Sequence, residues 1–253
     1  MKVNLYSKSG EKKGEIELPA VFSFNPRVDL VRKAFNAISL SLRQPYGSSP
    51  SAGMRRVGHN AGPGHGTARI PRTSGSSTAV LLANFVKGKS AHSPRTDKVL
   101  FKGINKKERK IAKFSSIALT SSKDAVKARG HRIPEEITLP VVVEDGIESI
   151  RKTKDAVEFL ESIGLYDDVQ RAKDGTKVRA GRGKMRGRRY RTPKSLLIVG
   201  NNYDNLRAFK SLPGVDIATY SSMSIRKLAP GGVGGRLTIF TESSLKMLEG
   251  EEQ

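Results

Sequence analysis

The stretch LPVVVED at residues 139–145 decides the fold class, because it is a short apolar run that does not alternate with polar residues. The same pattern returns three times further along the chain, as SLLIVG at 195–200, VDIATY at 215–220 and RLTIF at 236–240. Such runs are typical of strands that are buried on both faces. Helical spacing fills the gaps, which predicts helices at 154–163, 205–212, 224–228 and 241–248. Strands that alternate with helices favour right-handed crossovers, so we expect an α/β fold with an open, mostly parallel sheet flanked by helices.

Three more helices are predicted ahead of this region. The first covers 25–42, where an Asn-Pro pair supplies the N-cap and the first helical residue. Its apolar face would consist of Val28, Val31, Phe35, Ile38 and Leu42. The second begins near Asn105 with Glu108 as a capping-box partner. Its buried face would consist of Ile111, Phe114 and Ala118. A short third helix covers 123–129 and ends at Gly130.

The composition narrows the class of protein. Among 253 residues, 46 are Lys or Arg and 24 are Asp or Glu, which gives a net charge of +22. Such a charge builds a field that concentrates polyanions, and nucleic acid is the first partner to consider. At 36% hydrophobic residues the chain can still bury a core, so it is not a disordered basic tail. The absence of cysteine excludes disulfides, a thiol nucleophile and zinc sites with thiolate ligands.

The N-terminal segment is charged and lacks the apolar stretch of a signal peptide. The longest apolar run, at 78–86, is far shorter than the roughly 20 residues that a membrane span needs. We therefore expect a cytoplasmic protein with no membrane contact.

The positive charge gathers in two segments. Residues 30–96 contain no Asp or Glu but ten basic residues: Arg32, Lys33, Arg43, Arg55, Arg56, Arg69, Arg72, Lys87, Lys89 and Arg95. Residues 171–194 contain one acid, Asp174, and eleven basic residues: Arg171, Lys173, Lys177, Arg179, Arg182, Lys184, Arg186, Arg188, Arg189, Arg191 and Lys194. A short run of this kind would be read as a solvated face. In runs this long the like charges repel one another, so an ordered state needs a counter-anion. A phosphate backbone would supply it.

Residues 44–98 show no helical or alternating pattern, only Gly, Pro, Ser and basic residues around one apolar patch, AVLLANFV at 79–86. That patch fits either a short strand or a turn of helix. A structureless segment of this length is functional or disordered rather than part of a compact core. We interpret it as an extended basic loop at 45–98, inserted in a globular domain made of 1–44 and 99–253. Doubled back, it could reach at most about 90 Å at ~3.3 Å per residue. A disordered linker is the alternative, but a linker would not normally be so free of acidic residues.

Motifs for catalysis are weak. The glycine clusters at 62–66 and 231–235 lack both the GxxxxGK[ST] form and the strand–GxGxxG–helix form of phosphate loops, and we interpret the second as a turn. Three histidines have no carboxylate near them in sequence and are interpreted as RNA contacts: His59, His65 and His92. His131 follows a helix end and is expected at the surface. Glu144 and Asp145 follow a predicted strand, where α/β enzymes keep catalytic groups, but no nucleophile or second motif joins them. We expect no catalytic site, metal or cofactor.

Two pairs of motifs carry a family resemblance. GRGKMRGRRYR at 181–191 precedes the strand SLLIVGNN, and GHGTARIPR at 64–72 precedes VKGKSAHSPRTDK. With KERKIAKFSSIALT, RGHRI and LAPGGVGGRLTIFTESSL, the sequence resembles the family of the universal ribosomal large-subunit protein four in its archaeal and eukaryotic form. The resemblance covers essentially the whole chain. Because the chain stops soon after Leu248, without the long extension of the eukaryotic members, the archaeal form fits better.

The resemblance implies a structural constituent of the large ribosomal subunit that supports assembly and has no enzyme activity. It implies an α/β domain that binds large-subunit rRNA, and a long loop that runs through rRNA to the peptide exit tunnel. There the loop would meet ribosomal protein twenty-two and the nascent peptide, with residues 64–72 near the constriction and Arg69 and Arg72 as the foremost tip contacts. The residues expected to bind RNA are Arg43, Arg55, Arg56, His59, His65, Arg69, Arg72, Lys87, Lys89, His92, Arg95, Lys98, Arg179, Arg182, Lys184, Arg186, Arg188, Arg189 and Arg191.

Two other functions fit a basic α/β chain. An RNA-modifying or RNA-cleaving enzyme would need a cofactor or an acid/base pair, and the sequence offers neither. A chromatin-type protein that compacts nucleic acid would need neither a buried parallel sheet nor so long a single loop.

Overall fold

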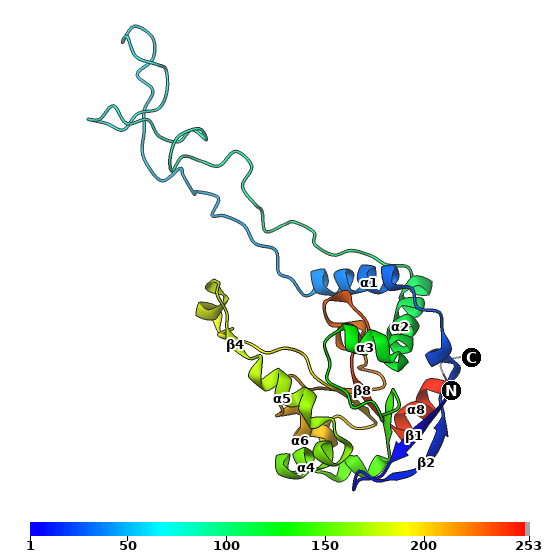
Figure 1. The fold of residues 1–253 in the computed structure, drawn as a ribbon. Coiled ribbons are helices and arrows are strands. Elements are labelled where there is room, and N and C mark those ends of the chain that lie inside the picture. The colour runs from blue at the N-terminus through cyan, green and yellow to red at the C-terminus, as the bar shows by residue number, and fades with distance from the viewer. Residues whose placement is uncertain (251–253) are drawn as a thin grey trace. The chain divides into compact units, whose positions relative to one another are not determined.

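The structure, a computed structural model, describes residues 1–250, so the last three residues of the predicted range 99–253 lie outside it. The described chain forms two compact units. One contains residues 1–39 and the chain from residue 103 onward, and we call it the α/β unit (Figure 1). The other, Leu40–Lys102, we call the loop unit.

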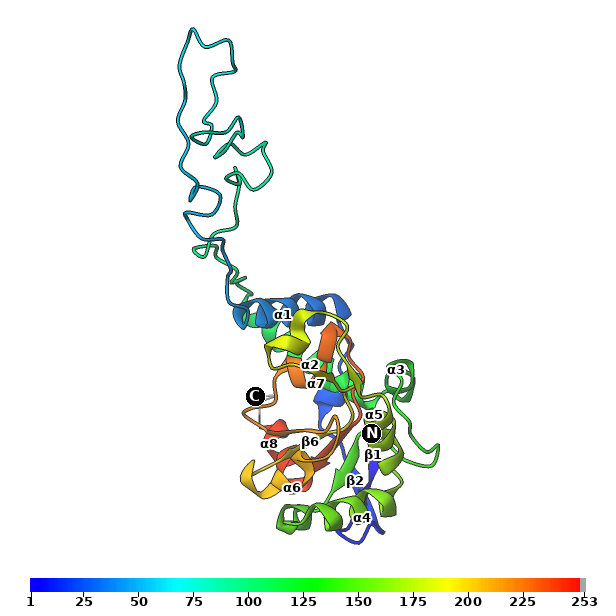
Figure 2. The ribbon, with the colours of Figure 1, turned by 90° about the vertical axis from the view of Figure 1, so that its left-hand side faces the viewer.

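A six-stranded sheet organises the α/β unit. In spatial order its strands are β2 (Lys12–Glu17), β1 (Lys2–Tyr6), β3 (Val141–Val143), β8 (Thr238–Thr241), β6 (Leu197–Gly200) and β7 (Asp216–Thr219). Strands β1 and β2 pair antiparallel, and every other neighbouring pair is parallel. The four strands that the sequence predicts are confirmed, as is the mostly parallel sheet. The N-terminal hairpin of β1 and β2, which was not predicted, extends one edge (Figure 2).

The central strands are buried on both faces, as their composition predicts. In β3, Val141 and Val143 belong to one hydrophobic core and Val142 belongs to another. The parallel register places Val142 opposite Phe240 of β8, which lies in the same core. Successive side chains of a strand point to opposite faces, so a continuous apolar run fills both layers at once.

Helices cover both faces of this sheet. They are α1 (Val28–Ser41), α2 (Lys106–Ser121), α3 (Lys123–Ala128), α4 (Thr153–Ile163), α5 (Tyr166–Asp174), α6 (Arg207–Lys210), α7 (Ile225–Leu228) and α8 (Glu242–Glu249). Short 3-10 turns are η1 (Ala20–Ser23), η2 (Asp145–Ser149), η4 (Asp204–Leu206) and η5 (Pro230–Gly232). Apolar residues of α4, α5 and α6 belong to the first core, and residues of α2, α7 and α8 belong to the second. Helix α5 was not predicted.

Helix α1 buries only part of its predicted face. Val31 is buried and Phe35 and Ile38 are half-buried, but Val28 and Leu42 are exposed, at 39% and 63%. The fully buried residues are Leu30, Val31, Ala34 and Ala37. Three of these pack with Ala112 of α2 and with Ile225 of α7 (Figure 2). The alanines carry little sequence signal, yet small side chains allow helices to approach closely, and the contact face therefore extends to them.

The start of helix α2 also differs in part from its prediction. Asn105 is the N-cap, as predicted, but its side chain makes no capping hydrogen bond. Glu108 does not close a capping box. Its carboxylate instead accepts a hydrogen bond from Nζ of Lys33 on α1 at 2.7 Å. An ion pair between two helices thus takes the place of the predicted capping hydrogen bond. Within residues 1–250, no helix is both long and apolar enough to cross a lipid bilayer.

Candidate nucleic-acid interface

The second basic segment of the sequence folds as a two-stranded hairpin, which we call the basic hairpin (residues 177–191). Its elements are β4 (Lys177–Val178), the 3-10 turn η3 (Arg182–Arg186) and β5 (Tyr190–Arg191). The two strands pair antiparallel, and the backbone N–H of Arg179 donates to the carbonyl of Arg189 at 2.9 Å. Gly187 closes the turn with a φ of +74°, a conformation that glycine adopts without steric cost.

The hairpin holds its cationic side chains in water. All seven predicted RNA contacts in it are exposed: Arg179, Arg182, Lys184, Arg186, Arg188, Arg189 and Arg191. Within the described residues, none of them forms an ion pair with a carboxylate. Met185 and Tyr190 are also exposed. The guanidinium carbon of Arg189 lies 5.6 Å from the centroid of the Tyr190 ring. The surface therefore offers charge for phosphates and an aromatic face for a base.

A buried carboxylate fastens the base of the hairpin. Asp168 on α5 is fully buried, and its Oδ2 accepts from Ser195 Oγ at 2.8 Å just before β6. Its Oδ1 accepts from Nε of Arg171 at 2.8 Å and from the backbone N–H of Arg132 at 3.0 Å. Arg171 in turn donates to the carbonyl of Lys194 at 2.9 Å. Both ends of the basic segment thus meet at one side chain, which gives the hairpin a fixed base.

The fourth partner of Asp168 corrects a prediction. His131 was expected at the surface, but it is buried, and its Nδ1 lies 3.0 Å from Oδ2 of Asp168. Burial alone would raise the pKa of the Asp168 carboxyl, but hydrogen bonds from His131 and Arg171 lower that pKa well below its usual range. Arg171, the first residue of the second basic segment, belongs to the same buried cluster. We call Asp168, His131, Arg171 and Ser195 the Asp168 cluster.

The loop unit contains turns and isolated bridges rather than regular elements. His59 and Arg72 exchange two backbone hydrogen bonds at 3.0 Å, and Arg72 also bridges to Ala79. Val80, in the predicted apolar patch, is 4% exposed. The patch forms neither the short strand nor the turn of helix that were predicted, although its Val80 is buried.

Most of the predicted contacts in the loop unit are exposed. They are Arg43, Arg55, Arg56, His59, His65, Arg69, Lys87, Lys89, His92, Arg95 and Lys98. Arg72 differs, because it is half-buried and its Nη1 donates to the carbonyl of Ser77 at 2.6 Å. Part of its side chain therefore holds the local turn. Arg69, three residues earlier, is left as the more accessible of the two predicted tip contacts.

The carboxylates at the end of β3 have structural partners. Glu144 pairs with Nζ of Lys13 at 3.0 Å. Asp145 accepts hydrogen bonds from the backbone N–H of Ser243 at 3.0 Å and from the Ser243 hydroxyl. These contacts join β3 to the edge hairpin and to α8. No group of three or more His, Cys, Asp or Glu residues with metal-binding geometry occurs in residues 1–250.

The glycine cluster at 231–235 forms a turn ahead of β8, as predicted. Gly231 and Gly235 have φ values of +80° and +82°. Arg129 donates to the carbonyls of Pro230 and Val233, so the end of α3 holds this turn. Two of its carbonyls are therefore engaged within the protein.

Comparison with known proteins decides the family. A family model described as the ribosomal protein L4/L1 family matches residues 16–251. The large ribosomal subunit protein uL4 of Thermoplasma volcanium is 64% identical over 247 residues, which are 98% of this chain and 97% of that protein. The chain belongs to the ribosomal protein L4/L1 family.

Further archaeal members of the ribosomal protein L4/L1 family match with the same coverage. The uL4 protein of Thermoplasma acidophilum is 62% identical over 252 residues, covering 100% of this chain and 99% of its own. That of Methanocaldococcus jannaschii is 46% identical over 250 residues, covering 98% of each. The resemblance drawn from the sequence motifs is thereby confirmed, and the relatives are archaeal, as expected.

Proposed function

We propose that this protein is a structural component of the large ribosomal subunit that binds rRNA through two surfaces, the basic hairpin and the loop unit. Membership of a ribosomal protein family supports the first part, and such a protein acts in translation as part of a ribonucleoprotein rather than as an enzyme. The observation that carries the second part is the row of exposed cations on the basic hairpin, none of which forms an ion pair with a carboxylate of residues 1–250. Each such cation can neutralise a phosphate and release a counterion.

The hairpin and the loop unit suit RNA more than duplex DNA. Bidentate arginines and an exposed aromatic ring match phosphates and unstacked bases, and residues 42–102 of the loop unit form no helix that could enter a major groove. Phosphate contacts would position the protein, and unpaired bases would supply specificity. Assembly of the subunit would then depend on the shape of the protein, its positive charge and the length of its loop unit.

We further propose that the loop unit lines the peptide exit tunnel. The family resemblance supports this role, with residues 64–72 near the constriction beside ribosomal protein twenty-two and the nascent chain. Within the loop unit, Gly62, Gly64 and Gly66 all have positive φ values and open space where a side chain would be. Such a backbone can approach RNA closely. In this proposal the protein works in the cytoplasm, on the ribosome.

Crosslinking in cells, followed by sequencing of the bound RNA, tests the proposed function. We expect large-subunit rRNA to dominate the recovered sequences. Recovery of small RNAs or of DNA in its place would contradict a ribosomal role. A variant with Arg186→Gln and Arg188→Gln should recover less rRNA than a variant with Lys12→Gln and Lys152→Gln, which removes the same charge from exposed sites elsewhere.

The loop unit has its own test. We expect residues 44–98 to be cut by protease in the isolated protein and protected in the ribosome, because rRNA would cover them. Equal cleavage in both states would instead indicate a plain linker.

A further inference from the structure

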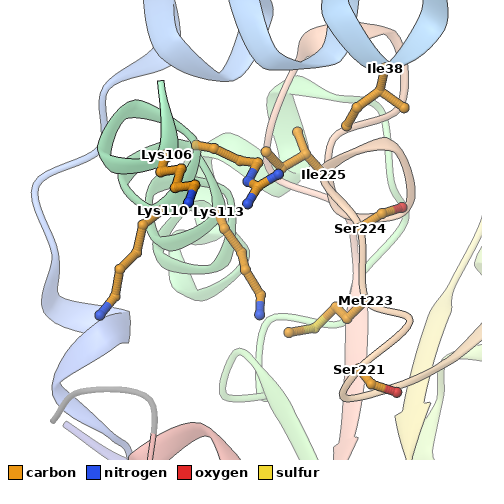
Figure 3. A pocket seen from close by; sticks show the side chains of 9 residues that line it. Ile38, Lys106, Lys110, Lys113, Ser221, Met223, Ser224 and Ile225 are labelled. Atoms are coloured by element: carbon orange, nitrogen blue, oxygen red, sulfur yellow. The ribbon is translucent and has the colours of Figure 1, made fainter. Parts of the chain in front are cut away.

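A groove lies in the α/β unit between helix α2 and the segment that leads into α7. Its volume is about 640 Å³, and nine residues line it (Figure 3). One wall is formed by four cations of α2, namely Lys106, Arg109, Lys110 and Lys113. The opposite wall is formed by Ser221, Met223, Ser224 and Ile225, with Ile38 of α1 at one end. None of the lining residues is acidic. We call this feature the α2 groove.

The four cations share one face of α2 because they are spaced at three, four and seven residues from Lys106. Neighbouring like charges at this spacing repel each other, and the first turn of a helix already carries partial positive charge. The one carboxylate of the first turn, Glu108, is turned away to Lys33. Within residues 1–250, Lys106, Arg109 and Lys110 make no ion pair with a carboxylate. An anion in the groove would relieve this repulsion.

Aromatic rings hold two of these cations in place. Nζ of Lys110 lies 5.4 Å from the centroid of the Phe114 ring, and Nζ of Lys113 lies 5.0 Å from that of Tyr220. A cation over a ring is restrained without losing its charge. The wall is therefore partly ordered before any ligand arrives.

The side chains of the opposite wall that face solvent are polar. Met223 and Ile225 are each 3% exposed and belong to separate hydrophobic cores, so they fix the wall without offering much surface. Figure 3 shows the Met223 side chain reaching from its segment toward α2. Ser221 and Ser224 are exposed, and serine hydroxyls can hydrogen-bond to the phosphates and sugars of a nucleic acid.

We propose that the α2 groove binds a short unpaired segment of RNA, with its phosphates on the α2 wall and its riboses toward Ser221 and Ser224. The seven steps from Lys106 to Lys113 span about 10 Å along a helix at 1.5 Å per residue. At no less than ~3.4 Å per nucleotide, that length accommodates about three nucleotides. This proposal rests on the proposed rRNA binding, and it adds a third surface that neither the basic hairpin nor the loop unit includes.

An acidic protein segment is the other polyanion that such a wall could attract. The proposed rRNA binding favours RNA, because a single strand that passes over the α/β unit would place its phosphates on these cations. Competition with poly-glutamate and with oligouridylate separates the two ligands.

Salt-dependent binding of Thermoplasma acidophilum large-subunit rRNA to the full-length protein tests the charged wall. The groove variant carries Lys106→Gln and Lys110→Gln, and the control carries Lys12→Gln and Lys152→Gln, with the same net charge. We expect the groove variant to bind more weakly and to lower the slope of log affinity against log salt by about 1.5, at roughly 0.7 per single-stranded phosphate contact. A groove variant that behaves like the control would overturn the proposal.

The two proposals can fail separately in this experiment. If the wild-type protein does not bind the rRNA at all, the proposed function fails. If the wild type binds and the Arg186→Gln, Arg188→Gln variant is weakened while the groove variant equals the control, only the α2 groove fails. Circular dichroism of each variant checks that the fold is kept.

Site-specific crosslinking tests the location without removing any charge. The chain has no cysteine, so Ser221→Cys introduces a single thiol that can carry an aryl azide, with Ser9→Cys on the N-terminal hairpin as the control. We expect the label at 221 to crosslink to rRNA and the label at 9 not to. Equal crosslinking from both sites would overturn the proposal. Loss of the 221 crosslink with poly-glutamate, but not with oligouridylate of equal charge, would assign the groove to an acidic protein segment instead.

Discussion

Oδ2 of Asp168 accepts a hydrogen bond from the hydroxyl of Ser195 at 2.8 Å, and both side chains are fully buried. The two residues stand on either side of the basic hairpin, one on α5 and one just before β6. The same carboxylate holds His131, so α3, α5 and β6 are joined at one point. A hairpin dense in like charges repels itself, and this contact keeps its two ends together.

Replacing the buried carboxylate should destabilise the α/β unit. In Asp168→Asn the side chain loses its charge while Arg171 and His131 keep their positions, and breaking a buried pair costs about 3–5 kcal/mol of unfolding free energy. Urea denaturation followed by circular dichroism measures this. Asp29→Asn, which breaks an exposed pair with Arg27, is the control and should leave the midpoint unchanged. If Asp168→Asn, like the control, leaves the urea midpoint unchanged, the Asp168 cluster contributes no stability.

The stability that Asp168 supplies should depend on pH. Its pKa is lowered in the folded state, so the folded protein binds a proton there less readily than the unfolded chain does. The contribution is therefore complete above the unfolded pKa of about 4 and is lost as the pH falls below it. The gap in unfolding free energy between wild type and Asp168→Asn should narrow from pH 6 to pH 3 in a series of urea titrations. A constant gap would contradict this linkage.

Arg236, two residues before β8, should not tolerate lysine. Its side chain is fully buried and donates to the carbonyls of Ser195, Leu196, Gly214 and Lys227, and its Nη1 lies 2.8 Å from Oδ2 of Asp216. A lysine ammonium cannot reach so many acceptors, and each buried carbonyl left unpaired is costly. We expect Arg236→Lys to lower the unfolding free energy by about 2–4 kcal/mol. Lys194→Gln removes a cation from the same Asp216 at an exposed site and should cost no more than about 1 kcal/mol. Equal losses in the two variants would show that burial of the guanidinium does not matter.

Two glycines with almost the same backbone angle should respond differently to alanine. Gly231 has open space where a Cβ would be, so Gly231→Ala should cost only the left-handed strain of about 1–2 kcal/mol. A Cβ on Gly235 would meet the carbonyl oxygen of Ala125 at 2.6 Å. Gly235→Ala should therefore cost about 1–3 kcal/mol more, from overpacking against α3. Thermal unfolding of both variants checks the order, and the reverse order would mean that α3 moves freely away from the turn.

Replacing Arg69 by alanine and replacing Arg72 by alanine should have different effects. Arg69→Ala removes an exposed cation and should disturb tunnel-dependent events, such as nascent-chain stalling, more than the abundance of the subunit. Arg72→Ala also removes the hydrogen bond to the Ser77 carbonyl, so it should additionally increase protease cleavage near residues 73–80 in the free protein. Ribosome profiles, stalling reporters and limited proteolysis measure the three effects. If Arg69→Ala lowers subunit abundance most, the residue acts in assembly rather than in the tunnel.

The prediction of the sheet succeeded because its signal is local. The runs around Val142, Ile198 and Ile239 are apolar on consecutive residues, and short runs of this kind are typical of a strand with two covered faces. Helix α5 was missed because its segment, YDDVQRAKD, is mostly charged and buries only Asp168, Val169 and Ala172. The α2 groove was missed for a similar reason. The spacing of its lysines was visible, but the facing wall comes from residues more than a hundred positions away.

The sequence by itself determined the α/β class, the places where positive charge gathers and the family, because each depends on residue types at short separations. Tertiary structure alone decided that His131 is buried against Asp168, that Arg236 lies in the core and that Glu108 leaves its helix cap for Lys33. The physical reason is that the free energy of a charged side chain depends on partners and burial supplied by distant segments. Asp168 looks like any surface acid in the printed chain. Only packing against Ser195, His131 and Arg171 makes it the point that holds the basic hairpin.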